Sequence, residues 1–233
     1  MTAEDSTSNL VPLVSIPKGT TTEKILCSIK IVVPFFLSAL KTHPNKKSIN
    51  ENGLTQIFVT QLNIYLASNL EYPFLTQTQY SDTYFGTKGI PDFFFHYREL
   101  GQDFPAIFVV EAKRLPSPEK SREKEYVIGE KIKTNSEKEC NGGIERFKNE
   151  KHGKGLKECG MLGFIEENDS SHWLKTINEW IGDLAQKDTK WKKDEELKEY
   201  ERNKESTYLK SDAHTVSAKK ILLHHFWVDI KTN

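Results

Sequence analysis

Cysteine is scarce in this chain, and neither sign of charge is in excess. The 233 residues include three cysteines, Cys27, Cys140 and Cys159, with no CxxC pair among them. An odd number of cysteines without paired spacing argues against a disulfide framework, so we expect a protein of the reducing cytoplasm. Because 33 basic residues balance 33 acidic ones, the overall charge does not by itself indicate a nucleic-acid-binding protein.

Signals for export and for membrane insertion are also missing. The most apolar stretch, residues 25–40, contains Lys30 and Pro34, is short for a membrane span and has no small-residue cleavage site. These features predict a buried helix with a kink at the proline, and no association with a membrane. The sequence likewise shows no helix-turn-helix, zinc finger, repeat of solenoid length or serine or cysteine triad.

No break in composition divides the chain into several domains. Residues 1–22 are rich in serine, threonine and proline with little apolar periodicity, which predicts a flexible N-terminal arm. Residues 23–233 are long enough for one α/β domain with a full core. We therefore predict a single domain over 23–233.

Two apolar strands with acidic residues at their ends are predicted within residues 89–114. Asp92 directly precedes a run of three phenylalanines, and Glu111 and Lys113 end an apolar run that starts at Ala106. Because side chains alternate along a strand, Glu111 and Lys113 share one face while Ala112 faces the other. A hairpin over residues 99–103 would bring the carboxylates of Asp92 and Glu111 together.

Two neighbouring carboxylates repel each other unless a cation lies between them. Oxygen ligands of this kind suit Mg²⁺ or Mn²⁺, which retain water ligands and accept a phosphate oxygen. A metal-bound water would be the nucleophile, and Lys113 could hold that water and stabilise its deprotonated form. The alternative interpretation is that Asp92 belongs to a turn and that Glu111 and Lys113 end a solvated strand.

The residues Pro91-Asp92 and Glu111-Ala112-Lys113 resemble the signature of the PD-(D/E)xK phosphodiesterase superfamily. This resemblance implies a restriction-endonuclease-like fold, with a central mixed sheet flanked by helices, and additional C-terminal strands would complete the chain. It also implies Mg²⁺ dependence and a DNA substrate. Asp92 and Glu111 match the metal ligands, Lys113 matches the catalytic lysine, and the Ala112 carbonyl would be a further ligand.

Many members of this superfamily add an acid from the helix before the first core strand. Glu51 is the candidate, because an apolar helical pattern begins at residues 51–54 and continues to Leu66. The competing explanation is that Glu51 only favours the helix N-terminus electrostatically.

A second block of interest contains the paired glycines Gly142 and Gly143. Free backbone amides at the start of the helix that follows would bind a phosphate, and Arg146, Lys148 and Lys151 would add cationic contacts. The alternative is a simple turn before a packed helix. Residues 113–157, which also include Arg114, hold 13 Lys and Arg against 8 Asp and Glu, an excess of +5 that would attract a phosphate backbone or form a solvated face.

The remainder of the chain completes an α/β pattern. It predicts a strand over 161–165, a helix over 173–184, a surface helix or mobile loop over 186–204, and late strands over 206–210 and 219–230. His224 and His225 would point to opposite faces of the last strand and so could not serve one site.

The patterns and the resemblance together predict a Mg²⁺-dependent or Mn²⁺-dependent nuclease, and the resemblance implies that it hydrolyses DNA, with RNA the less expected substrate. A role in bacterial defence is implied by the resemblance alone. We expect an endonuclease, and a homodimer would allow it to cut both strands. A catalytically inactive nucleic-acid-binding module of the same fold and a structural or interaction protein are the alternatives.

Overall fold

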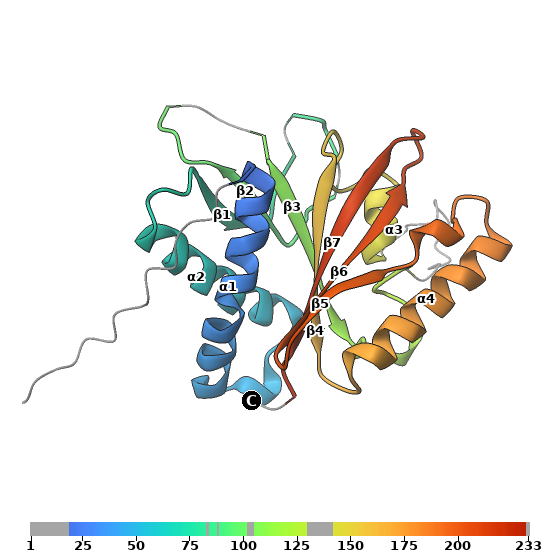
Figure 1. The fold of residues 1–233 in the computed structure, drawn as a ribbon, viewed down its shortest axis with the longest axis horizontal. Coiled ribbons are helices and arrows are strands. Elements are labelled where there is room, and N and C mark those ends of the chain that lie inside the picture. Colours follow the sequence, from blue (N-terminus) through green and yellow to red (C-terminus); the bar gives the residue numbers. More distant parts are fainter. Residues whose placement is uncertain (1–18, 83, 88, 102–104, 130–141, 232–233) are drawn as a thin grey trace, which may run out of the picture.

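A seven-stranded mixed sheet lies between two pairs of helices in the computed structural model (Figure 1). The structure describes residues 19–82, 84–87, 89–101, 105–129 and 142–231. The α/β class expected from the sequence is therefore confirmed. Most of the predicted arm, residues 1–18, lies outside the described residues, as does Cys140.

The strands follow the order β1-β2-β3-β4-β7-β6-β5 across the sheet. The central strands β3, β4 and β7 are mutually parallel, and every other neighbouring pair is antiparallel. Central parallel strands that are covered on both faces account for the apolar runs in the sequence. The strand bounds are β1 Phe74–Thr78, β2 Phe93–Tyr97, β3 Phe108–Leu115, β4 Glu158–Ile165, β5 Lys198–Arg202, β6 Ser206–His214 and β7 Lys220–Asp229.

The helices α1 (Thr21–Thr42) and α2 (Glu51–Ser68) cover one face of the sheet, with the short 3-10 turn η1 (Lys46–Ser48) between them. Thr20 and Glu23 form a capping box that starts α1, so the helix begins at Thr21, one residue before the predicted end of the arm. By length and composition α1 could also cross a membrane. Seven of its eight buried residues belong to the apolar core that it shares with α2, as expected of a core helix, and Pro34 lies inside it.

The opposite face carries α3 (Gly143–Lys148) and α4 (Ser170–Lys187), together with the 3-10 turns η2 (Lys120–Arg122) and η3 (Lys193–Glu195). Alternate residues of each strand enter the two cores. Phe93 and Phe95 join the α1–α2 side, whereas Phe94 joins the α3–α4 side. This division is the period of two expected for a strand buried on both faces.

Several predicted elements are longer than the patterns indicated, and one prediction is wrong. The predicted strands over 161–165, 206–210 and 219–230 correspond to β4, β6 and β7, and the helix predicted over 173–184 is α4. The segment 186–204 was expected to be a surface helix or mobile loop, but it contains η3 and the edge strand β5. All five residues of β5 are exposed, so no apolar alternation marked it as a strand.

Candidate active site

The pairing of β2 with β3 brings Asp92 to the end of the apolar run on β3. Phe93 pairs with Val110 in this antiparallel hairpin, so the preceding residue, Asp92, lies opposite Glu111. Asp92 is half-buried, and its Oδ2 atom accepts a hydrogen bond of 2.7 Å from the backbone N–H of Ala112. The register of a single hairpin therefore unites the two acids that the sequence had paired.

Lys113 connects the other charged groups of the site. Its ammonium nitrogen, Nζ, lies 2.9 Å from Glu111 Oε1 and 2.9 Å from Glu51 Oε1. It also donates a hydrogen bond of 2.7 Å to the carbonyl of Ala112, the oxygen expected as a further metal ligand. Glu111 and Lys113 are both buried, so these contacts lie largely out of water.

Glu51 is the first residue of α2, so it lies at the opposite end of this helix from the connection to β1. Its Oε2 atom accepts a hydrogen bond of 3.1 Å from the backbone N–H of Arg114, while Asn50 caps the helix by accepting from Gly53. The structure thus places Glu51 with Lys113, although the same position in the first turn also suits the helix dipole.

The charges in this cluster shift one another's protonation. Burial and the neighbouring Glu111 carboxylate raise the pKa of Asp92 to about 7, although Lys113 opposes that rise. Burial would also raise the pKa of Glu111, but the charge of Lys113, the adjacent His152 ring and the charge of Arg146 outweigh it and lower this pKa to about 2. Burial disfavours the charge on Lys113, yet the carboxylates of Glu111, Glu51 and Asp92 raise its pKa above the usual value. Lys113 is therefore a charged donor and not a base.

Two further residues contact Glu111 that the strand pattern did not identify in this role. Arg146 Nη1 of α3 lies 2.7 Å from Glu111 Oε1, and His152 Nδ1 lies 3.2 Å from Glu111 Oε2. The sequence suggested Arg146 as a phosphate contact and gave His152 no role. The glycine-flanked block at 142–153 was the available signal, but nothing in it specified Glu111 as the partner.

The backbone amides at the start of α3, which the phosphate-site prediction required to be free, have partners within the protein. The backbone N–H groups of Gly143, Ile144 and Glu145 donate to the carbonyls of Glu125, Tyr126 and Val127 at 2.8, 3.1 and 3.0 Å. The amides at the start of α3 are therefore already hydrogen-bonded to the chain that precedes it.

Lys148, predicted as a nucleic-acid contact, has its partners within the protein. Its side chain is buried, pairs with Glu195, and donates to the carbonyl of His214. Arg114 pairs with Glu166 through two hydrogen bonds of 2.9 and 2.6 Å, so its guanidinium is engaged within the protein. Lys151 lies half-buried beside His152.

The cluster fits a metal ion that is bound by few protein ligands. Within the described ranges, no three His, Cys, Asp or Glu side chains are grouped so as to hold a metal ion. Mg²⁺ needs only one or two carboxylates, with water and substrate oxygens as its other ligands. Among the described residues, the buried Oε2 atom of Glu111 has no hydrogen-bond partner, and the raised pKa of Asp92 indicates that Lys113 and the Ala112 N–H do not fully offset its burial and the neighbouring Glu111 carboxylate. Both acids would be stabilised by a hard cation.

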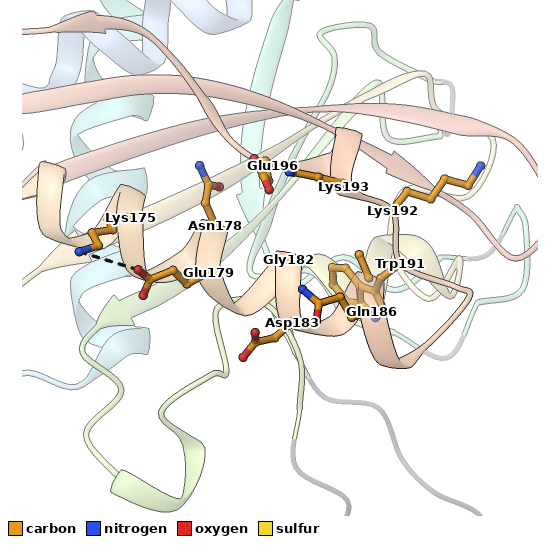
Figure 2. Close-up of a pocket in the computed structure, with 11 residues that line it drawn as sticks. Lys175, Asn178, Glu179, Gly182, Asp183, Gln186, Trp191, Lys192, Lys193 and Glu196 are labelled. Carbon is orange, nitrogen blue, oxygen red and sulfur yellow. Dashed lines mark ion pairs between the residues drawn. The ribbon is translucent and has the colours of Figure 1, made fainter.

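Two open hollows of about 620 Å³ each differ in their relation to this cluster. The first, drawn in Figure 2, lies between α4 and η3 and shares no residue with the cluster; its labelled lining residues are Lys175, Asn178, Glu179, Gly182, Asp183, Gln186, Trp191, Lys192, Lys193 and Glu196. The second extends from the end of α1 to the first turns of α2 and includes Asn50, the residue before Glu51, but no residue of the cluster itself.

No family model, curated protein or solved structure matches this chain significantly.

Proposed function

We propose that this protein is a metal-dependent phosphodiesterase of the PD-(D/E)xK type, with a restriction-endonuclease-like core and DNA as its substrate. The observation that carries the proposal is the contact of Lys113 with two acids from separate elements, Glu111 and Glu51, beside Asp92. These residues span positions 51–113, and the resemblance in the sequence assigns them to one site.

The burial of this cluster supports a functional site over a purely structural one. Placing several charged groups in a protein interior costs free energy, and well-packed apolar residues often stabilise a fold as well or better. The protein nevertheless places Glu111 and Lys113 at the centre of the sheet, with 0% and 4% of their surfaces exposed. Groups retained at such a cost are candidates for catalysis.

Each residue has a distinct role in the proposed reaction. Asp92, Glu111 and the carbonyl of Ala112 would hold Mg²⁺ or Mn²⁺. The bound ion would lower the pKa of a water ligand and offset the charge that develops on the phosphoryl oxygens. Lys113 remains protonated and donates hydrogen bonds to the attacking or phosphoryl oxygen, while Glu51 orients Lys113.

Cleavage by variants of these residues tests the proposal. We expect Mg²⁺-dependent cleavage of labelled DNA by the wild-type protein, and a loss of about 100-fold or more in Asp92→Ala and in Lys113→Ala, since each removes a group that acts on the reacting phosphate. Asp212→Ala and Lys220→Ala are matched controls, because that pair, at 2.7 Å, joins β6 to β7 at the protein surface. The controls should cleave at the wild-type rate.

The substrate panel should contain linear, circular and single-stranded DNA and RNA, with Mg²⁺ and with Mn²⁺. Absence of cleavage across this panel would overturn the enzyme proposal, and salt-sensitive DNA binding by the same protein would then favour the inactive binding module. Cleavage of RNA alone would support the proposed metal-dependent reaction but would show that the substrate is RNA and not DNA.

A further inference from the structure

The block at 142–153 supplies Glu111 with two partners of different character. Arg146 Nη1 and Lys113 Nζ both contact Glu111 Oε1, at 2.7 and 2.9 Å. His152 Nδ1 lies near the other oxygen, Oε2, at 3.2 Å. One carboxylate thus faces two permanent cations and an imidazole.

The two cations on Oε1 differ in how firmly they are held. Lys113 has 5% of its side chain exposed and also contacts Glu51 and the Ala112 carbonyl. Arg146 has 25% of its side chain exposed and extends from the six-residue helix α3. A long side chain that already reaches solvent can leave an ion pair at a smaller cost than a buried one.

A divalent cation on Glu111 would repel both of these cations at short range. The repulsion is strong where water is largely excluded, because the effective dielectric constant is low. Displacing Arg146 relieves the repulsion, since its guanidinium can turn toward solvent. Lys113 has no such route, because it is buried and paired with Glu51.

We propose that Arg146 is an exchangeable counter-ion of Glu111, which it neutralises until a divalent metal binds, and that the released guanidinium then contacts a phosphate of the substrate. The inference rests on the proposed function and adds to it a specific role for Arg146. A planar guanidinium is suited to both partners, because it forms paired hydrogen bonds with carboxylates and with phosphates.

His152 has the complementary role of positioning Glu111 while Arg146 moves from Glu111 to a phosphate of the substrate. It is 1% exposed, and its ring packs edge-on against Phe147. Gly89 leaves the space that the ring needs, because a Cβ atom at that position would lie 2.4 Å from His152 Cδ2. A ring packed this closely keeps its place whether or not Arg146 is bound to Glu111.

Metal binding by Arg146→Gln tests this proposal without relying on catalysis. Titration of the protein with Mn²⁺ alone, by calorimetry or electron paramagnetic resonance, should show tighter binding in Arg146→Gln than in the wild type, on the order of tenfold, because a competing cation has been removed. A purely structural role for Arg146 predicts weaker binding instead. Cleavage of DNA by the same variant should fall about 100-fold, because the phosphate contact is lost.

Two other variants complete the experiment. Arg202→Gln is the matched control, because it removes a guanidinium paired with Glu199 on the edge strand β5, and its Mn²⁺ affinity should equal that of the wild type. Arg146→Lys retains the charge and should bind Mn²⁺ as the wild type does, which keeps the test valid should Arg146→Gln unfold.

The outcomes separate this inference from the proposed function. The first case is a wild-type protein that binds Mn²⁺ and cleaves DNA. In that case, equal or weaker Mn²⁺ binding by Arg146→Gln would overturn the counter-ion role alone. Tighter binding by Arg146→Lys would do the same. A wild-type protein that neither binds Mn²⁺ nor cleaves DNA would overturn both.

Discussion

Individual residues of the candidate site were predictable from the sequence to the extent that local pattern determined them. Asp92, Glu111 and Lys113 lie at the ends of apolar strands, and the strand period alone indicates that the last two share a face. The contacts of Arg146 and His152 with Glu111 were not predictable, because they join residues 35 and 41 positions apart through tertiary packing. No periodicity in the sequence specifies such a partner.

The buried histidine His225 illustrates how one side chain can make stability depend on pH. Its Nδ1 atom lies 2.8 Å from the Tyr126 hydroxyl and its Nε2 atom 2.9 Å from the Ser211 hydroxyl. Because Trp227 donates to the Tyr126 oxygen, the Tyr126 hydroxyl is available to donate to His225. Burial, with a smaller effect from His224, lowers the pKa of His225 to about 3, so the folded protein holds this ring neutral.

We therefore predict that acid weakens the fold through His225. The pKa of this histidine is lower in the folded state than in the unfolded state, so its stabilising effect is complete above pH 6.5 and declines as the pH falls toward 3. Between pH 6.5 and 5 the free energy of unfolding should fall by about 2 kcal/mol. Urea unfolding of His225→Gln should show a flatter pH dependence than the wild type.

The matched control for this measurement is His172→Gln, which replaces an exposed histidine on α4. It should retain the pH dependence of the wild type. Parallel curves for His225→Gln and the wild type would contradict the assignment.

At the scale of elements, apolar periodicity predicted the buried strands and helices. It did not predict the exposed strand β5, and it could not predict the hydrogen-bond partners of the backbone amides of α3. The sequence of β5 alternates charged residues around one tyrosine, which is also typical of a loop or surface helix. The amides of α3 could not be assigned from the glycines, because their acceptors lie in residues 125–127 and only the tertiary fold brings them together. Local propensity does not contain this information.

The short helix α3 is tied to the rest of the protein by the buried pair of Lys148 with Glu195 in η3. Lys148→Met should lower the free energy of unfolding by about 3 kcal/mol or more, because it leaves the Glu195 carboxylate buried without its cation. The double variant Lys148→Met/Glu195→Gln should recover part of this loss, since the neutral amide no longer needs a cation and its oxygen still accepts from one of the backbone N–H groups of Lys192 and His214. Chemical denaturation of both variants measures the difference.

A matched lysine on the same side of the sheet provides the control. Lys175 is 79% exposed and lies 3.9 Å from Glu179, as drawn in Figure 2. Lys175→Met should change the free energy of unfolding by less than about 0.5 kcal/mol. An equally small effect of Lys148→Met would show that the buried pair does not stabilise the protein, and would restore Lys148 as a candidate nucleic-acid contact.

For the whole molecule, the sequence was sufficient to predict an α/β chain, whereas the order of strands emerged only from the structure. The site is assembled from the start of α2, the β2–β3 hairpin and the α3 block, which the parallel pairing of β3 with β4 brings to one region. Residues from different elements between positions 51 and 152 therefore form a single cluster of charges. A balanced net charge hides such a cluster, because its acids and cations cancel within the site.

The most direct test of the central claim is a crystal of the protein soaked in Mn²⁺ and measured at a wavelength where manganese scatters anomalously. Our account predicts an anomalous peak bound to carboxylate oxygens of Asp92 and Glu111 and to the carbonyl of Ala112, with Arg146 withdrawn from Glu111. A crystal without a peak there, in which Lys113 and Arg146 both still contact Glu111, would contradict the proposal of a metal-dependent phosphodiesterase.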